Sequence, residues 1–504
     1  MLNTILDTPP WALATALASI LLALVVVSKI SEERSIRALG GRAATYRTYL
    51  PFGIDLVYQS VKHAVNHTLL QQWQAIFADN HSHTVEGNAA GKRFIFTDDP
   101  ENIKAVLATQ FHDFGKGPVF HENWSAFLGD SIFTTDLEQW HSSRQLIRPQ
   151  FLKDRVSDLE VFELHAQKLL DHMGGRGQTV DADKLFFRYT LDAATDFLLG
   201  KSVNSLDNPQ VEFAEAFSEV QRVQNLMTSA GMFNVIIPKR GFRAGLKVIN
   251  EFVHPYIERA LRLSPAELEK KANDDRYTFL HALASFTRDR KVIRDQLVAV
   301  LLAGRDTTAA TLSWTFYELS RHPEVVEKLR REISETIGLH RAPSYADLKS
   351  MKYLQHTINE TLRLYPAVPF NIRVSLHATT LPHGAGPDGL SPVGIPPFTP
   401  IGYSPLTMQR REDLYPVSTP AAPFPPAADY NPDRWDTWTP KAWHYIPFNG
   451  GPRICVGQQF ALAEMSYTVV RILQRFRTVE KRWTDGMVSL KSEVTLQPGG
   501  EGVK

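Results

Sequence analysis

The chain has 504 residues, of which 43% are hydrophobic and 22% are charged. This composition is typical of a globular protein with a large buried core, and it argues against global disorder. The formal net charge of +1 provides no broad basic field, so no nucleic-acid partner is expected. A single cysteine excludes an internal disulfide and argues against a secreted, disulfide-stapled protein.

An uninterrupted apolar segment, WALATALASILLALVVVS, occupies residues 11–28. In helical form it spans about 27 Å, close to the thickness of a bilayer's hydrocarbon core. A signal peptide would carry a basic residue before this stretch, and residues 1–10 contain none. A buried core helix would normally carry a polar stripe. The pattern therefore predicts a transmembrane helix at 11–28, within a membrane anchor of residues 1–30.

The charges around this segment indicate its orientation. Only Asp7 precedes it, whereas a series of basic residues follows it: Lys29, Arg34, Arg37, Arg42 and Arg47. The positive-inside bias places the rest of the chain in the cytosol. Cytosolic sequons meet no glycosylation machinery, so four sequons are interpreted as chance matches: Asn66, Asn80, Asn123 and Asn359.

Helical patterns dominate the remainder of the chain. They cover 155–173, 181–199, 211–228, 246–262, 290–321 and 323–337. Strand patterns occur at 91–98 and between 372 and 405. With no internal repeat and no long linker, we predict a mainly α protein with small β-sheets and one catalytic domain, residues 31–504. The proline-rich segment 416–429 is predicted to be an extended surface loop.

A glycine-rich segment surrounds the only cysteine, Cys455. Residues 448–457 read FNGGPRICVG, with Arg453 two positions before the cysteine, and residues 458–476 are helical in pattern. The glycines permit tight turns and a close approach of the backbone to a flat ligand. Backbone N–H groups, Arg453 and the helix N-terminus would lower the pKa of the thiol. A cysteine hydrolase would also need a histidine base, which no local signature supplies, and the pattern is too specific for a plain glycine-rich turn.

Polar residues interrupt a second, otherwise apolar helix. After LVAVLLA at 297–303 come Gly304, Asp306, Thr307 and Thr308. Gly304 would let a ligand approach the helix, and a threonine hydroxyl can bond back to a carbonyl of the preceding turn. Taken alone, this pattern is equally typical of an amphipathic helix with a polar patch.

Two further pairs have helical spacing. Glu360 and Arg363 share a helix face at i,i+3, and Arg434 follows in a Tyr-Asn-Pro-Asp-Arg-Trp segment. Trp140 and Arg144 share a face at i,i+4. Taken alone, each pair is most simply interpreted as an ordinary contact on the protein surface.

In their order along the chain, from the Trp140–Arg144 pair to the cysteine loop, these five motifs resemble those of the cytochrome P-450 superfamily over about residues 50–480. The resemblance implies the cytochrome P-450 fold and haem b (heme b) as cofactor, with Cys455 as the axial thiolate ligand of the iron. It further implies that Phe448 packs near the sulfur. The haem propionates would be held by Arg453, Trp140, Arg144 and Arg373.

The resemblance also assigns the remaining motif residues. Asp306 and Thr307 would relay protons to bound dioxygen. Glu360, Arg363 and Arg434 would form a buried ion triad that supports the cysteine loop, and truncating any of them should damage folding or haem retention.

A narrower resemblance points to the fungal alkane- and fatty-acid-hydroxylating branch. It rests on FNGGPRICVGQQFALAEMSY, AGRDTTAATLSW and PFGIDLVYQSVKHAVNH. It implies terminal or near-terminal hydroxylation of a long-chain fatty acid or n-alkane, in the endoplasmic reticulum membrane, with electrons from NADPH–cytochrome P-450 reductase. Two features depart from the branch pattern: the insertion at 416–429, and Tyr430 in place of the usual Phe.

Three alternatives stay open at this point. A haem-thiolate isomerase or peroxygenase would not use dioxygen, and intact Asp306 and Thr307 argue against it. A non-catalytic haem sensor would give no product. A monooxygenase step in a fungal polyketide or terpenoid pathway would use the same machinery on another hydrophobic small molecule.

Overall fold

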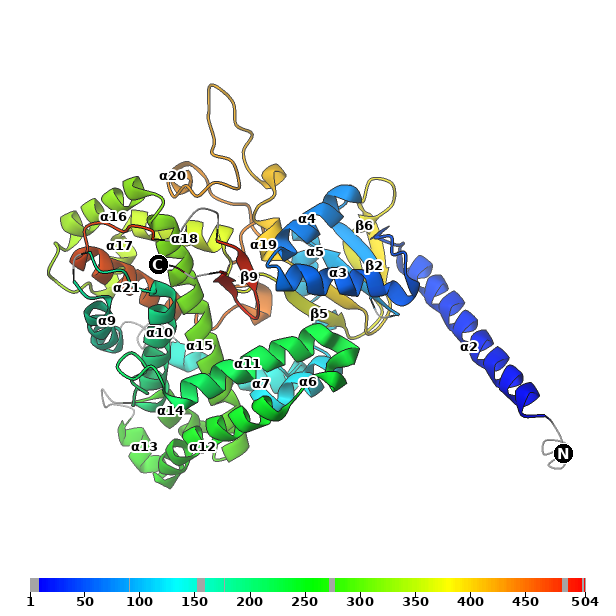
Figure 1. The fold of residues 1–504 in the computed structure, drawn as a ribbon, viewed down its shortest axis with the longest axis horizontal. Coiled ribbons are helices and arrows are strands. Elements are labelled where there is room, and N and C mark those ends of the chain that lie inside the picture. The colour runs from blue at the N-terminus through cyan, green and yellow to red at the C-terminus, as the bar shows by residue number, and fades with distance from the viewer. Residues whose placement is uncertain are drawn as a thin grey trace.

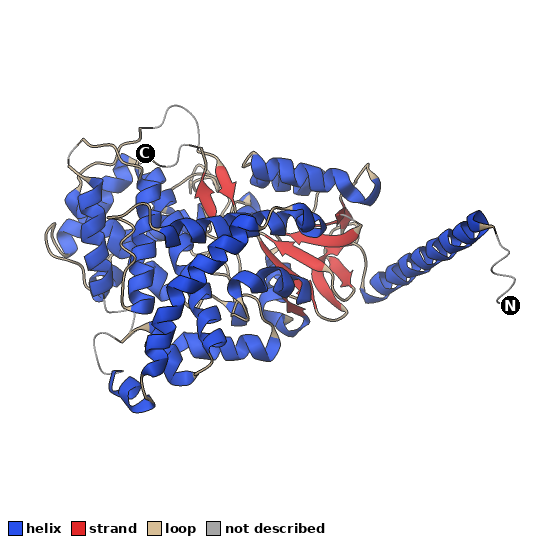
Figure 2. Cartoon of the chain, turned by 60° about the horizontal axis from the view of Figure 1, so that its bottom comes forward, coloured by secondary structure: helices blue, strands red, loops and turns tan. Residues whose placement is uncertain are grey.

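The computed structural model describes residues 9–89, 91–151, 159–175, 177–271, 277–482, 488–500 and 503. Helices make up most of the body, and the larger sheet lies near the end from which helix α2 (Pro10–Leu39) projects (Figures 1 and 2). The expectation of a mainly α protein with small sheets is confirmed.

The α-helices after α2 include one for each of the predicted helical patterns, together with others that were not predicted. They are α3 (Ile54–Val65), α4 (Leu69–Asp79), α5 (Pro100–Lys104), α6 (Pro118–Leu128), α7 (Leu137–Ile147), α9 (Glu160–Met173), α10 (Ala182–Leu199), α11 (Glu212–Ala230), α12 (Arg240–Arg262), α13 (Pro265–Lys271), α14 (Phe279–Phe286), α15 (Arg290–Leu319), α16 (Pro323–Thr336), α17 (Tyr345–Ser350), α18 (Lys352–Leu364), α19 (Pro405–Met408), α20 (Arg434–Thr437) and α21 (Gln458–Arg475). Residues 155–158 of the predicted helix 155–173 lie outside the described residues. The rest of that prediction corresponds to α9.

The strands are β1 (Ala44–Thr45), β2 (Thr84–Ala89), β3 (Lys92–Thr97), β4 (Phe114–Gly115), β5 (Asn371–Ser375), β6 (Thr379–Ala385), β7 (Ser391–Ile395), β8 (Pro400–Tyr403), β9 (Leu490–Ser492) and β10 (Leu496–Pro498). Six of them form one sheet in the order β1-β2-β3-β8-β5-β4, and β6–β7 and β9–β10 are separate antiparallel pairs. β3 and β8 pair in parallel, which joins the two predicted strand regions in one sheet.

Helix α15 runs through the centre of the fold and contacts α10, α12, α18 and α21. Its N-cap is Asp289, whose carboxylate accepts hydrogen bonds from the backbone N–H groups of Lys291 and Val292. Most of its side chains between Ile293 and Leu319 are buried, on every side of the helix. Other elements therefore surround α15 along most of its length. The prediction for 290–321 is confirmed to within two residues.

Helix α12 begins six residues earlier than its predicted start at 246. Residues 240–245 contain two glycines, which weaken a helical signal. In the fold, Phe242 is buried and a Cβ at Gly245 would lie 2.9 Å from the carbonyl oxygen of Ala216 in α11. Close packing between the two helices therefore outweighs the low intrinsic propensity.

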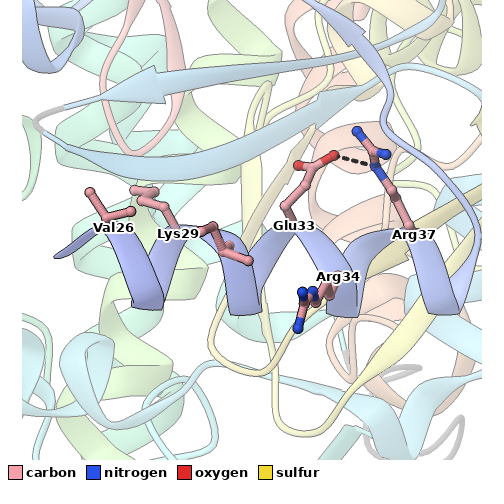
Figure 3. A pocket seen from close by; sticks show the side chains of 6 residues that line it. Val26, Lys29, Glu33, Arg34 and Arg37 are labelled. Carbon is pink, nitrogen blue, oxygen red and sulfur yellow. Dashed lines mark hydrogen bonds and ion pairs between the residues drawn. The ribbon is translucent and has the colours of Figure 1, made fainter. Parts of the chain in front are cut away.

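Helix α2 is docked onto the body at its C-terminal end. Ile36 is completely buried, and a Cβ at Gly394 of β7 would lie 2.2 Å from the Ile36 carbonyl oxygen. Glu33 forms ion pairs with Arg37 and with Arg42 (the Glu33–Arg37 pair is drawn in Figure 3). The pocket drawn in that figure is lined by α2 alone.

Among the described residues, α2 is the one helix long and apolar enough to cross a membrane. The candidate span is Trp11–Leu39, and it contains an 18-residue window with a mean hydropathy of 2.3 in which no residue is buried inside the protein. The predicted transmembrane segment 11–28 lies within it.

Candidate active site

The cysteine loop lies between the short 3-10 helix η7 (Gly451–Arg453) and α21. The backbone N–H of Cys455 donates to the carbonyl of Phe448 at 3.0 Å. Gly451 has a φ of +64°, and a Cβ there would lie 1.9 Å from the carbonyl oxygen of Leu107. The loop therefore packs so closely on the segment around Leu107 that only glycine fits at this position.

The Cys455 side chain is surrounded by protein and yet remains accessible to solvent. Burial raises the pKa of its thiol, while the backbone N–H of Gly457 and the charge of Arg144 act in the opposite direction. The N–H of Gly457 at the start of α21 thus acts to lower the pKa as expected, but desolvation is the larger effect and the net shift is upward.

One narrow face of α15 is also accessible. Ala303, Gly304 and Thr307 are half-buried, whereas Leu301 and Leu302 before them are buried. The Thr307 hydroxyl donates to the carbonyl of Ala303 at 2.7 Å, the predicted back-bond to the preceding turn. Spacings of three and four residues place these positions on one side of the helix.

The same segment of α15 is linked to the helix that follows the cysteine loop. Val456, next to Cys455, packs against the apolar cluster that contains Leu301 and Leu302. On α21, Glu464 is buried against Thr308, and burial raises the pKa of its carboxyl to about 8, opposed by the Thr308 hydroxyl. Helices α15 and α21 therefore bring two of the sequence motifs together.

Asp306 does not lie on the accessible face of α15. Its buried carboxylate accepts a hydrogen bond from Gln221 Nε2 on α11, and Arg305 Nη1 lies 3.5 Å from its Oδ1. The pKa of Asp306 is raised overall, mainly by burial and also by the charge of Glu493. The charge of Arg305 and the hydrogen bond from Gln221 oppose this shift. Asp306 and Thr307 are adjacent in sequence but face different sides of the helix.

A cluster of cations surrounds Trp140 on α7. The Arg453 guanidinium lies over the Trp140 ring at 4.8 Å and that of Arg144 at 5.9 Å. Arg144 Nη1 also donates to the carbonyl of Ile454 at 2.9 Å, which ties α7 to the cysteine loop. The predicted i,i+4 pair therefore shares one face, as expected, and Arg453 joins it.

Two more cations complete this cluster, Arg373 on β5 and Lys116 just before α6. Burial and then the charges of Arg373 and Arg453 hold the pKa of Lys116 well below its usual range. Burial and the charge of Arg373 likewise lower the pKa of Arg453 to about 10. The positive charges of Arg373 and Arg453 therefore both act on Lys116, and that of Arg373 also acts on Arg453.

Asp136, the N-cap residue of α7, is the acid within this cluster. Its carboxylate accepts a 2.6 Å hydrogen bond from Arg453 Nη2 and further hydrogen bonds from the backbone N–H groups of Lys116 and Gly117. It thereby fixes the 115–117 loop against the cysteine loop.

Glu360, Arg363 and Arg434 meet in the interior, remote in sequence from the cysteine but in contact with one another. Glu360 pairs with Arg363 and with Arg434 at 2.8 Å in each case, and the three side chains are buried. Burial raises the pKa of Glu360, but the two guanidinium groups outweigh it and lower the pKa overall.

The proline-rich segment takes part in this arrangement. Residues 416–423 are exposed, as predicted, and project from the body (Figure 1). Its second half, however, supplies carbonyl groups that accept from the two arginines: Pro425, Pro426 and Asp429 from Arg434, and Ala427 and Asp429 from Arg363. The segment is therefore a surface loop, in which Ala427 is the one buried residue of 416–429, but its second half is held in place by the two arginines. Tyr430 is buried, and its hydroxyl donates to the carbonyl of Thr357.

Sequence reasoning missed Lys116, Asp136 and Gln221. Asp136 stands at the N-cap position of α7, where Asp is common, although its side chain makes no capping hydrogen bond there. Lys116 and Gln221 carry no motif, and they reach the site only through contacts between distant segments.

The chain matches the sequence model of the cytochrome P-450 family over residues 62–501. It is 49% identical to cytochrome P-450 monooxygenase pvhE of Talaromyces variabilis, covering 94% of this chain and 91% of that protein. It is 40% identical to cytochrome P-450 52A13 of Debaryomyces hansenii, covering 92% and 91%.

The crystal structure of the cytochrome P-450DA haem domain has the same fold, with a TM-score of 0.75 at 19% identity, covering 92% of this chain and 98% of that one. The predicted fold and enzyme class are confirmed. The chain belongs to the cytochrome P-450 family and has its haem-thiolate monooxygenase architecture.

Proposed function

We propose that this protein is a membrane-anchored monooxygenase that hydroxylates the terminal or near-terminal carbon of a long-chain fatty acid or n-alkane. The observation that carries the proposal is the position of Cys455. A haem-thiolate enzyme needs one cysteine, and the chain has only this one, accessible just ahead of α21, the helix that contacts α15.

The residues around Cys455 fit a haem. The donor set of Trp140, Arg144, Arg373 and Arg453 is suited to the two propionates of haem b, and Lys116 adds a fifth group. Arg453 Nε is buried and has no hydrogen-bond partner in the part of the chain that the structure describes. An unpaired buried guanidinium N–H and an excess of cations are both stabilised by a bound dianion.

When bound, the haem would supply the binding and reduction of dioxygen, tuned by the Cys455 thiolate. The protein's own residues would then control protons and water. Thr307 lies on the accessible face of α15, and Asp306 is a buried acid whose raised pKa favours holding a proton. We assign Asp306 and Thr307 the delivery of protons, and Phe448 the shielding of the cysteine sulfur.

The ion triad has a supporting role in this proposal. Glu360, Arg363 and Arg434 cross-link α18, α20 and the proline-rich segment ahead of the cysteine loop. We assign it the stabilisation of the region that carries Cys455.

The assignment of residues 1–30 to a membrane anchor and 31–504 to a catalytic domain is part of the proposal. We place the catalytic domain on the cytosolic side of the endoplasmic reticulum membrane, with NADPH–cytochrome P-450 reductase as electron donor. The apolar window within Trp11–Leu39, exposed over its length, and the basic residues that follow residue 28 support this arrangement.

The substrate class rests on the motifs shared with the fungal alkane and fatty-acid hydroxylases, together with the 40% identity to cytochrome P-450 52A13. A long aliphatic chain is recognised mainly through burial of its CH₂ groups, at about 0.8 kcal/mol for each. Ligands of increasing chain length should therefore bind with steadily increasing affinity until the pocket is filled.

The test begins with the reduced carbon-monoxide difference spectrum of wild type and of Cys455→Ser. We expect a strongly red-shifted Soret band in wild type and none in the variant, and its absence in wild type would refute the proposal. Reconstitution with the reductase, NADPH and fatty acids or n-alkanes of graded length should then yield hydroxylated products. Products from polyketides or terpenoids alone would refute the substrate assignment, and turnover without NADPH or dioxygen would refute the reaction class.

A further inference from the structure

Gln221 of α11 lies between two charged residues of α15. Its Nε2 donates to Asp306 Oδ2, and its Oε1 accepts from Arg305 Nη1 at 3.1 Å. A single amide therefore bridges the cation and the carboxylate, and it comes from a different helix. Both ends of the amide are used, so its orientation is determined.

The ion pair that Gln221 bridges is buried and sparsely bonded. Arg305 and Asp306 are 8% and 3% exposed. Arg305 Nε and Asp306 Oδ1 have no hydrogen-bond partner among the described residues. A buried ion pair with unused donors and acceptors depends strongly on the hydrogen bonds that remain. For the Asp306 carboxylate, the remaining neutral donor is the Gln221 amide.

The neighbours of the pair add little polar support. The Arg305 guanidinium lies over the rings of Phe187 and Phe217, each at 5.6 Å, and Nη2 donates to Ser218 Oγ on α11 at 3.0 Å. The other charge that acts on Asp306 is Glu493, in the turn between β9 and β10, and it opposes ionisation. The carboxyl thus faces one cation, one anion and one amide.

We propose that Gln221 is a positioning residue that holds the Asp306 carboxyl in the orientation needed for proton delivery. Oδ2 is occupied by the amide, which leaves Oδ1 as the oxygen that gains and releases the proton. The inference rests on the proposed role of Asp306 in the monooxygenase reaction. It also makes the position of α11 part of the proton path, because displacing this helix removes both bridging hydrogen bonds.

Gln221→Leu removes both hydrogen bonds at similar volume, and Gln221→Glu replaces the N–H donor with a second carboxyl group. Gln224→Leu is the matched control, since Gln224 lies on the same helix and bonds to the Asn123 carbonyl at 3.1 Å instead. All three are compared with wild type as haem-loaded, full-length proteins whose unfolding temperatures are also measured.

The first readout does not need turnover. The infrared C=O band of protonated Asp306, assigned by its loss in Asp306→Asn, is followed against pH. Loss of the Nε2 donor should raise the titration midpoint by about one pH unit in Gln221→Leu and by at least as much in Gln221→Glu, with no shift in Gln224→Leu. An unshifted midpoint in Gln221→Leu would overturn the proposal.

The second readout is the yield of product per NADPH consumed in the reconstituted system. We expect about a threefold to tenfold lower yield in Gln221→Leu, with more hydrogen peroxide released and a changed solvent isotope effect, and no change in Gln224→Leu. A shifted midpoint with an unchanged yield would overturn the role in proton delivery. If wild type gives no NADPH-dependent product, the proposed function fails, while the infrared titration still decides whether Gln221 positions Asp306.

Discussion

The carboxylate of Glu360 accepts two hydrogen bonds from the guanidinium of Arg363, from Nε at 2.8 Å and from Nη2 at 2.9 Å, and both side chains are completely inaccessible. The same carboxylate also accepts from Arg434 Nε at 2.8 Å and from the indole N–H of Trp435 at 3.0 Å. Such full use of its lone pairs is what allows two arginines and one acid to stay buried.

Replacing Glu360 with Gln should therefore be severe. Two buried guanidinium groups would lose their counter-charge, at a cost of about 3–5 kcal/mol in unfolding free energy. We expect a lower unfolding temperature and reduced haem retention, measured by thermal unfolding and by absorbance ratio. Glu219→Gln is the control, because the Glu219–Arg222 pair is solvent-exposed and should contribute at most about 1 kcal/mol. Equal unfolding temperatures in the two variants would contradict the triad's structural role.

Gly451→Ala should disrupt the cysteine loop. The added Cβ would meet the Leu107 carbonyl oxygen at 1.9 Å, so either the loop or the segment around Leu107 must move. Gly338→Ala is the control: Gly338 also has a positive φ, +74°, but no atom lies within 4 Å of its built Cβ. It should cost only the backbone strain of about 1 kcal/mol. Loss of the red-shifted carbon-monoxide band in Gly451→Ala alone is the expected result, and an intact band would refute this account.

Lys116→Met should have opposite effects on the haem-free and haem-loaded proteins. A lysine whose folded pKa lies below its unfolded value destabilises the fold at every pH below that unfolded value, because the unfolded chain binds the proton more tightly. Removing the charge should raise the unfolding temperature of the haem-free protein at pH 7.

The same change should speed transfer of haem to apomyoglobin, because one cation facing the propionates is lost. Lys291→Met is the control, since Lys291 lies on the exposed side of an ion pair with Asp130. Slower or unchanged haem transfer in Lys116→Met would contradict its assignment to the propionate site.

Glu464→Gln tests the buried acid on α21. The folded pKa of about 8 lies above the usual value of 4.5, so wild type should lose stability as the pH rises between these two values. At about 1.4 kcal/mol for each pKa unit, the loss approaches about 5 kcal/mol above pH 8. The variant should match wild type near pH 5 and exceed it in unfolding temperature at pH 8.5. Parallel pH profiles for the two proteins would show that Glu464 is not a neutral buried acid.

Local patterns were sufficient for several of the long helices, among them α10, α15 and α16, and for the boundaries of the central one to within two residues. Asp289 caps α15, and continuous apolar residues mark it as buried. The Thr307 back-bond was also foreseeable, because it joins residues one turn apart. Interactions of this kind depend on spacing within one helix, which the sequence specifies directly.

The start of α12 and the role of the proline-rich segment were not foreseeable in this way. Phe242 and Gly245 are helical because they pack against α11, and the carbonyl groups of residues 425–429 are ordered by two arginines. Here a long-range contact decides a local conformation, and local propensity is a weak guide.

The motif around Cys455 depends on the sequence alone: one thiol, its glycines and its neighbouring Arg453 are contiguous. The tertiary structure decided how Lys116 and Asp136 join this motif through Arg453, and how Gln221 of α11 reaches Asp306 of α15. It also decided the sign of the thiol's pKa shift. Desolvation depends on all atoms packed around the sulfur, and their number is a property of the fold rather than of any segment.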